Sequence, residues 1–483
     1  MKKVAPFVGA LWVVVGMAAL AAYMVYGYTH EVELEDGSRK FANPRYWTVG
    51  ERVSKETFDQ AQSLSQGQRL EEGPADVLFF SNVPELPIYT GVLTRVDDVL
   101  APTGVTKALF SHFNMLVNFT TNPLSNYRAK VGLIITNNTG IPIDVYMRRN
   151  AKGVNVDEKD IRLLQDDLAP RNPATNEDIY YGSQLGNKVV HEFFRSVSQG
   201  ETKVASLLPG EDYYWYEKAG TRAWAIGIAE FAFRDSTSGK ILKQGDLPKS
   251  QGIQMCSFIC ELGTELKEFS RWASGPETIL NQSDYEHIHM RGLISAGVNR
   301  TYSVKYDARK EGLLSLFLGP GLKDGTDSSV AGTARYKPEM FLNDKVGGID
   351  KYGHIAGQQV KELPVENNGS YGIEYQIQID AEGPFAIAIQ AAGAGYEQFG
   401  KPKVDLYNQW MTAKLDDEVR TLTFRDPNYW SYFSDFSKLG PLGTGRVFFL
   451  VDQRGHHQHK LSLILPPNNY APYRVLLMPL SKW

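Results

Sequence analysis

The stretch Tyr371-Gly-Ile-Glu-Tyr-Gln-Ile-Gln-Ile-Asp380 decides the fold class. Every second residue in it is apolar, in the order Tyr371, Ile373, Tyr375, Ile377 and Ile379, and the residues between them are polar or small. Side chains of a β-strand point alternately to the two faces of its sheet. This alternation therefore predicts a strand of an antiparallel sheet with one buried face.

Similar strand-like runs recur along the chain. They are VLFF at 77–80, VGLII at 131–135, IPIDVYMRR at 141–149, DYYWYE at 212–217, TRAWAIGIAEFAF at 221–233, GPFAIAIQAAG at 383–393, RVFFLVD at 446–452, KLSLILPP at 460–467 and YRVLLMPL at 473–480. Short antiparallel strands separated by frequent turn signals build sandwiches or barrels. We predict a mainly β chain with two antiparallel β-sandwich-like domains and short helical insertions.

The length and the distribution of these runs predict the domain organisation. A chain of 483 residues exceeds one ordinary core, so two or three domains are expected. The expected order is a signal anchor at 1–28, a polar stalk at 29–75, a first sandwich at 76–233, a linker with a helix at 234–284 and a second sandwich at 285–483. Helical patterns are expected at 54–66 in the stalk and at 187–198 within the first sandwich, where Val190, Phe193, Phe194 and Val197 share one helical face.

Two connections in these domains look like hairpin turns. Residues 131–149 form two strand-like runs around the turn TNNTG, which predicts a β-hairpin. The run QRGHHQH at 453–459 lies between two further strand-like runs and is expected to be the exposed tip of a second hairpin.

The N-terminus predicts a membrane location. Pro6 to Tyr28 carries no charged side chain and is about as long as the ~20 residues that cross a bilayer. Because the apolar run continues past the small-x-small sequence at Ala19, we expect an uncleaved anchor. Lys2 and Lys3 place the N-terminus in the cytoplasm and the bulk of the chain outside the cell.

Charge and cysteine content narrow the classes of function. The net charge is -4, and the chain has no block of basic residues of the kind that binds nucleic acid. We therefore exclude the class of nucleic-acid-binding proteins. Cys256 and Cys260 are the only cysteines, in MCSFICELG, which we interpret as part of a helix spanning 256–273. Buried thiols on that helix are the favoured interpretation, and a short-range disulfide is the alternative.

Histidines are the candidate metal ligands. His287 and His289 lie two residues apart, so on a strand both imidazoles face the same side. His456, His457 and His459 fall on the expected hairpin tip, where we expect them to be solvated and to lack the partners that orient metal-bound histidines. No cofactor is expected, and a metal ion on these histidines is the alternative.

Aromatic residues gather in two stretches, at 212–224 and 426–436. Outside a cell, such rings can stack on sugars, so the candidate stacking residues are Tyr213, Trp215, Trp224, Tyr429, Trp430 and Tyr432. The alternative is that these aromatics belong to the core of a sandwich. No nucleophile elbow, zinc-protease motif or phosphate-binding loop occurs, and no catalytic residue is assigned.

Four segments carry a family resemblance. ADVLFFSNVPELPIYTGVL, LFSHFNMLVNFTTNPLSNYRAKVGLIITNNTGIPIDVYMRR, NNGSYGIEYQIQIDAEGPFAIAIQAAGAG and YRVLLMPL resemble uncharacterised secreted proteins of the Gram-positive cell envelope, some of which carry a stalk domain like the N-terminal domain of copper amine oxidases. The resemblance implies an envelope protein without known enzymatic activity. Cell-wall glycan or another surface protein is the expected partner, and a metal-dependent enzyme is the remaining alternative.

Overall fold

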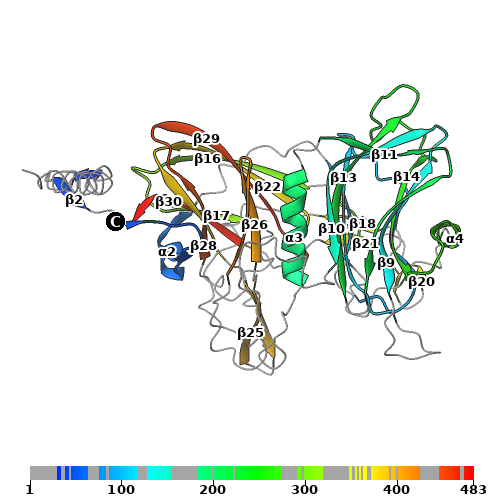
Figure 1. Ribbon diagram of the computed structural model, residues 1–483, viewed down its shortest axis with the longest axis horizontal. Coiled ribbons are helices and arrows are strands. Elements are labelled where there is room, and N and C mark those ends of the chain that lie inside the picture. The colour runs from blue at the N-terminus through cyan, green and yellow to red at the C-terminus, as the bar shows by residue number, and fades with distance from the viewer. Residues whose placement is uncertain are drawn as a thin grey trace, which may run out of the picture.

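The computed structural model is mainly β, as the alternating runs predicted, and most of its strand pairs are antiparallel (Figure 1). The structure describes residues 30–33, 39–42, 45–63, 76–82, 86–116, 128–154, 182–196, 200–220, 223–273, 280, 291–294, 298–318, 347–350, 354–355, 358–359, 363–366, 371–390, 393–398, 401–407, 410–424, 445–467 and 473–482. The expected anchor at 6–28 lies outside these residues. Within them, no helix is both long and apolar enough to cross a membrane.

Two facing sheets form the first sandwich. The larger has the strand order β11-β10-β13-β8-β6-β15-β18-β21 and the smaller β12-β9-β14-β7. Apolar side chains from both sheets meet between them, with the Trp215 ring packed edge-on against Phe110 and Phe231. The strands are β6 (Val77–Ser81), β7 (Gly91–Val96), β8 (Val105–Phe113), β9 (Ala129–Asn138), β10 (Ile143–Val154), β11 (Thr202–Leu207), β12 (Asp212–Ala219), β13 (Trp224–Asp235), β14 (Gly252–Glu261), β15 (Arg291–Ile294), β18 (Gly347–Asp350) and β21 (Leu363–Glu366).

The second sandwich also has two sheets, in the orders β16-β22-β29-β26-β27 and β4-β28-β23-β30-β17-β5. The inward residues of β22 are buried as predicted, from Ile373 just before the strand to Ile379. The strands are β4 (Arg52–Val53), β5 (Gln62–Ser63), β16 (Asn299–Asp307), β17 (Leu314–Leu318), β22 (Glu374–Glu382), β23 (Phe385–Gln390), β26 (Trp410–Leu415), β27 (Glu418–Thr423), β28 (Gly445–Val451), β29 (His456–Ile464) and β30 (Tyr473–Pro479). Small two-stranded pairs are β1 (His30–Glu33) with β2 (Arg39–Ala42), β3 (Arg45–Tyr46) with β31 (Ser481–Lys482), β19 (His354–Ile355) with β20 (Gln358–Gln359), and β24 (Gly393–Gln398) with β25 (Lys401–Tyr407).

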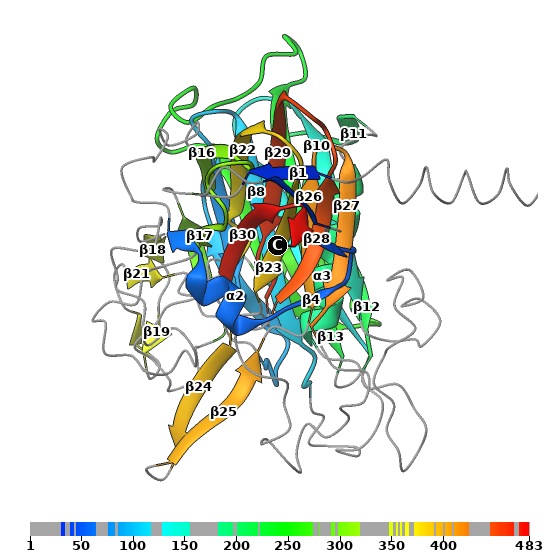
Figure 2. The ribbon, with the colours of Figure 1, turned by 90° about the vertical axis from the view of Figure 1, so that its left-hand side faces the viewer.

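The two sandwiches are interleaved in sequence, which corrects the expected domain boundaries. The expected stalk supplies β4, β5 and helix α2 (Lys55–Gln60) to the second sandwich, and Figure 2 shows α2 and β4 beside its strands. Phe58 of α2 is fully buried on the outer face of the six-stranded sheet. Conversely, β15, β18 and β21 come from the region expected to form the second sandwich but complete the eight-stranded sheet of the first. Sequence runs identified these strands without showing which sheet each one joins.

Neither expected hairpin forms, because the two strands that each turn connects lie in opposite sheets of a sandwich. β9 pairs with β12 and β14, whereas β10 pairs with β11 and β13 in the opposite sheet. Similarly, β28 and β29 belong to different sheets of the second sandwich. The turn residues are where the sequence placed them, but the chain crosses the core there instead of folding back beside itself.

The expected linker also belongs to the first sandwich. Residues 252–261 form β14 between β9 and β7, so the helix expected from Cys256 is wrong for its first part. Helix α4 begins only at Leu266, ends at Trp272 and covers the outer face of the four-stranded sheet. Cys256, Phe258 and Cys260 alternate along the strand and share its outer face. The four-residue spacing of the two cysteines also fits one turn of a helix, and it was interpreted that way.

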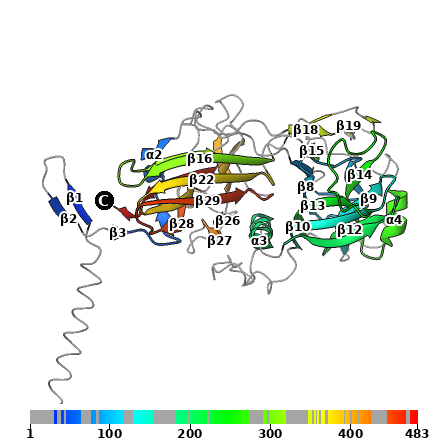
Figure 3. The ribbon, with the colours of Figure 1, turned by 90° about the horizontal axis from the view of Figure 1, so that it is seen from above.

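Helix α3 (Gly182–Arg195) lies between the two sandwiches (Figures 1 and 3). Val190, Phe193 and Phe194, predicted on one face, are buried in a core shared by the eight-stranded sheet and the second sandwich, and Val197 lies outside the described residues. Asn187 Nδ2 donates to the Trp410 carbonyl at 3.0 Å, which ties the helix to β26. Both faces of the eight-stranded sheet are therefore covered.

Candidate functional site

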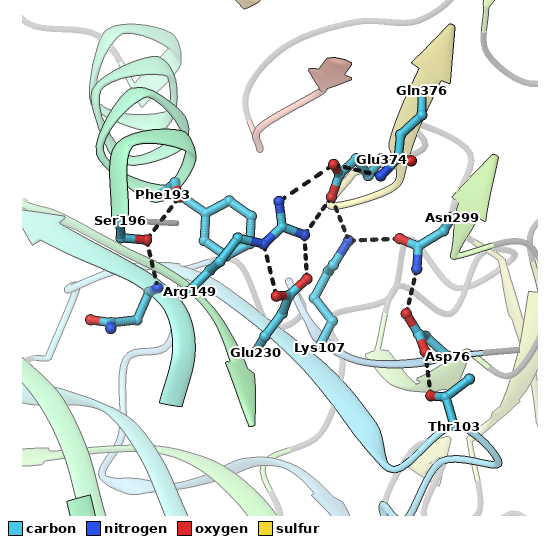
Figure 4. Close-up of polar contacts among 11 residues, drawn as sticks. Asp76, Thr103, Lys107, Arg149, Phe193, Ser196, Glu230, Asn299, Glu374 and Gln376 are labelled. Carbon is cyan, nitrogen blue, oxygen red and sulfur yellow. Dashed lines mark hydrogen bonds and ion pairs between the residues drawn. The ribbon is translucent and has the colours of Figure 1, made fainter. Parts of the chain in front are cut away.

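A pair of opposite charges is buried on two neighbouring strands of the first sandwich. Lys107 of β8 and Glu230 of β13 are directly opposite each other in the sheet, and both are buried. Burying an unpaired charge costs several kcal/mol, so each of these side chains needs a partner of opposite charge. They lie on the face of the eight-stranded sheet that meets the second sandwich, shown in Figure 4.

Arg149 reaches this face because of a β-bulge. The pairing of β10 with β13 shifts between Met147 and Asn150, so two residues of β10 stand opposite Glu230. A bulge of this kind redirects side chains that would otherwise keep alternating. The guanidinium of Arg149 then donates from Nε to a Glu230 carboxylate oxygen at 2.7 Å and stacks 4.4 Å above the Phe193 ring of α3.

Glu374 supplies the second sandwich's part of the cluster. It stands at the start of β22, and its side chain is only 3% exposed although the strand pattern placed it on the solvent face. Arg149 Nη2 donates to Glu374 Oε2 at 2.6 Å, and Lys107 Nζ lies 3.6 Å from the same oxygen. Burial raises the pKa of Glu374, but the attraction of Arg149 and Lys107 outweighs it and lowers the pKa to about 2.

Further hydrogen-bonded side chains extend the cluster along the boundary. Lys107 Nζ donates to Asn299 Oδ1 at 3.1 Å, and Asn299 donates in turn to Asp76, which also accepts from Thr103. Gln376 Nε2 donates to Glu374 at 3.0 Å. We call the set Asp76, Lys107, Arg149, Glu230, Asn299 and Glu374 the junction cluster, because its members come from both sandwiches.

The junction cluster is suited to joining the sandwiches rather than to acid–base chemistry. A general acid or base works best with a pKa near the working pH and with access to its substrate. Glu374 is buried and remains a carboxylate far below neutral pH, and Arg149 is held protonated because Glu374 and Glu230 outweigh the effect of its burial and raise its pKa. Two cations facing two carboxylates at the core of the cluster leave a compact and nearly neutral set of ion pairs.

A buried serine–histidine pair in the first sandwich was also missed by the sequence analysis. Ser81 Oγ lies 2.9 Å from His112 Nε2 and 2.7 Å from Thr94 Oγ1, and Ser257 completes the group. The Ser–His distance matches that of a nucleophile and its base. All four side chains are at most 1% exposed, so in this arrangement the group connects β6, β7, β8 and β14 inside the core.

The histidines expected at a loop tip lie instead on a strand. His456, His457 and His459 belong to β29, paired with β22, so the expected hairpin tip is wrong, and the expected exposure to solvent holds for His456 alone. His456 is mostly exposed and contacts Asp380 at 2.5 Å. His457 and His459 are partly buried, with 3.0 Å between a nitrogen of each ring. Across the described part of the chain, no three His, Cys, Asp or Glu side chains are grouped to hold a metal ion.

The aromatic candidates that the structure describes do not form an exposed platform. Trp215 is 5% exposed and packs between the sheets of the first sandwich, because the alternation of β12 turns it inward. Tyr213 is half-buried against the same core, and Trp224 packs on Phe113 with ring centroids 5.2 Å apart. The stretch at 212–224 therefore belongs largely to the core, which was the alternative interpretation.

The two cysteines are free thiols on β14, and both are buried. Four residues along a strand separate Cα atoms by roughly 13 Å, too far for a disulfide. Burial raises the pKa of Cys256 and of Cys260 to about 12, so neither is a reactive thiolate at neutral pH. The disulfide alternative is wrong, and of the favoured interpretation the burial holds but the helix does not, because both thiols lie on a strand.

Several candidate residues fall outside the described part of the chain. These are His287, His289, Tyr429, Trp430 and Tyr432, and for them the metal and stacking assignments stay predictions.

Comparisons with known proteins do not assign a family. No family model matches the chain, and no curated protein matches it. Among solved structures, a weak match is the N-terminal CBM22-1-CBM22-2 tandem domain of Xyn10C from Paenibacillus barcinonensis, with 8% identity, coverage of 85% of this chain and 91% of that chain, and a TM-score of 0.11. A TM-score this low carries no argument about fold or function.

Proposed function

We propose that this chain is a membrane-anchored extracytoplasmic protein whose two β-sandwiches act as one body in a non-catalytic binding or structural role at the cell envelope. Residues 6–28 serve as the anchor in this proposal, with the N-terminus in the cytoplasm and the sandwiches outside. The observation that carries the proposal is the junction cluster, in which Glu374 of the second sandwich forms ion pairs with Lys107 and Arg149 of the first.

Interlocked sandwiches favour a scaffold over a hinged binding pair. Interfaces between domains of one chain are often modest and polar, so relative motion is the ordinary expectation. Here a shared apolar core, a helix packed on both sides and a set of buried ion pairs oppose such motion. A body of this kind keeps surfaces on its two ends at a constant separation, which suits a support or a binding platform outside a membrane.

The membrane topology is tested in cells that express the full chain. We expect the protein to sediment with membranes and to be digested when protease is added to intact, wall-stripped cells. A matched chain of residues 29–483 behind a cleavable secretion signal is expected in the medium. Protection of the full chain from external protease would contradict the proposed location.

The binding role is tested with isolated cell envelopes. The purified chain is mixed with native envelopes and with envelopes stripped of protein, and bound protein is measured after sedimentation. Retention on both preparations indicates a wall-polymer partner such as a glycan, whereas retention on native envelopes alone indicates a protein partner. A chain that sediments with neither preparation has no such binding role.

A further inference from the structure

Two histidine rings of β29 close one end of the second sandwich. His457 and His459 share the inward face of the strand. His456, the first residue of β29, points to the outer face, where it contacts Asp380. The His457 ring stacks on Phe385 with centroids 5.7 Å apart and planes inclined by 6°, and His459 meets the same ring edge-on at 6.0 Å. The apolar surface of Phe385 therefore restricts both imidazoles.

In each ring, the nitrogen that points away from the other histidine is the outer nitrogen. It lies beside a hydrogen-bond acceptor that carries no hydrogen of its own. His459 Nδ1 lies 2.7 Å from a carboxylate oxygen of Asp416, in the turn between β26 and β27. His457 Nε2 lies 3.1 Å from the carbonyl oxygen of Gly383, in the turn between β22 and β23. A carbonyl or an ionised carboxylate only accepts, so both outer nitrogens carry the hydrogen and donate it.

The inner nitrogens then face each other as acceptors. His459 Nε2 and His457 Nδ1 are 3.0 Å apart, and a neutral imidazole carries one hydrogen, which its outer nitrogen already holds. Two neutral rings would turn two lone pairs toward one another at this distance. A proton between these nitrogens, or a metal ion beside the line that joins them, removes that repulsion.

We propose that His457 and His459 form a chelating site for a borderline divalent transition-metal ion, with Cu²⁺ bound most tightly. Metal–nitrogen bonds of about 2.0–2.1 Å, applied to nitrogens 3.0 Å apart, give an angle of about 90° at the metal, which suits adjacent positions of a tetragonal Cu²⁺ ion. Water completes the coordination, because the protein supplies two ligands among the residues described. Imidazole is a ligand for both copper and zinc, and the divalent affinity order favours copper.

The surroundings match those of metal-binding histidines. Such histidines almost always donate their other ring hydrogen to a carboxylate or a backbone carbonyl, which fixes the tautomer and the ring orientation. Asp416 and Gly383 already hold the two rings in this way. Asp416 also accepts from the backbone N–H of Lys460 at 2.8 Å, so the carboxylate itself is fixed in place.

The test uses the full chain, purified in detergent without a histidine tag and titrated with Cu²⁺. Electron paramagnetic resonance is expected to show one copper ion with two imidazole nitrogens at one equivalent. His457→Gln and His459→Gln are expected to weaken binding roughly tenfold or more and to remove the two-nitrogen signal. Asp416→Asn, which keeps the shape but removes the charge, is expected to weaken it by about tenfold.

His456→Gln is the matched control, because this neighbouring histidine points to the other face of the sheet. It is expected to keep both the affinity and the two-nitrogen signal, and thermal unfolding shows whether each variant is folded. Unchanged copper binding in folded His457→Gln and His459→Gln overturns the proposal. So does a signal that disappears only in a His287→Ala/His289→Ala variant. Neither outcome bears on the membrane anchor or on the scaffold role.

Discussion

Replacing Glu374 by glutamine removes one charge from the junction cluster while keeping the shape of the side chain. In the wild-type protein, Arg149 and Lys107 lower the pKa of this carboxyl from 4.5 to about 2. Each pKa unit corresponds to 1.36 kcal/mol, so the carboxylate contributes about 3 kcal/mol to the free energy of unfolding at neutral pH. That value lies at the lower end of the roughly 3–5 kcal/mol lost when one partner of a buried ion pair is removed.

The pH dependence of this contribution has a definite sign. The pKa of Glu374 is lower in the folded protein than in the unfolded chain, so folding favours the ionised form. Its contribution is therefore fully present above pH 4.5 and is lost as the pH falls from 4.5 toward 2. The difference in stability between wild type and Glu374→Gln is expected to shrink across that window.

Urea unfolding of both proteins at several pH values measures this difference. Glu382→Gln is the control, because it removes a carboxylate at the end of the same strand. The partner of that carboxylate, Arg309, is largely exposed, so we expect the free energy of unfolding to fall by less than about 1 kcal/mol. A loss under about 1 kcal/mol for Glu374→Gln at pH 7, or a difference that stays constant between pH 5 and 2.5, would refute the reasoning.

A double variant separates the ion pair from simple loss of packing. Lys107→Met alone leaves Glu374 with one cation fewer in a buried site, so it is also expected to destabilise the protein. In the combined variant neither charge is left without its partner, and the loss is expected to be smaller than the sum of the two single losses. Strictly additive losses would mean that the two side chains act independently.

Two further predictions concern α3 and β14. In Gly186→Ala, the added Cβ meets the Pro467 carbonyl oxygen at 2.9 Å, and we expect urea unfolding to show a loss of about 1–2 kcal/mol despite the better helix propensity of alanine. Gly263→Ala, where an added Cβ meets nothing within 4 Å, is the control and should be nearly neutral. Burial raises the pKa of Cys256 and of Cys260 to about 12, so both thiols should resist iodoacetamide at pH 8 in the folded protein and react with it in urea. Mass spectrometry measures the modification. Modification of the folded protein would contradict the burial of these thiols.

The strands were predictable from the sequence because their signal is local. Alternation in β22 and the apolar runs of β6 and β13 depend only on which side chains face the core. Sheet membership is not local, since a short polar turn such as the one between β9 and β10 permits either a hairpin or a crossing between facing sheets. The phase of the alternation does not distinguish these cases, because both place every second residue in the same core.

The histidines of β29 were misplaced for a related reason. The sequence Gly455-His-His-Gln-His459 is polar, and polar residues after a turn signal were interpreted as a loop. In the structure the strand extends beyond its apolar part, and its polar end pairs with the equally polar end of β22, where Glu382 stands opposite His456. Backbone pairing continues after the hydrophobic pattern stops, which burial patterns alone do not reveal.

The junction cluster had a signal in the sequence that is physical rather than motif-like. Lys107 and Glu230 are charged residues inside strands whose burial patterns are almost continuous. Such a residue is tolerated only when another element brings the opposite charge, so each one predicts a tertiary contact. What the sequence lacks is the identity of the partner, since Glu374 looks like any outward residue of an alternating strand until the second sandwich is placed against the first. The same reasoning explains why the cluster stabilises the arrangement selectively: a shifted contact between the sandwiches would leave Lys107 buried without its carboxylate, at a cost comparable to the about 3 kcal/mol expected for Glu374→Gln.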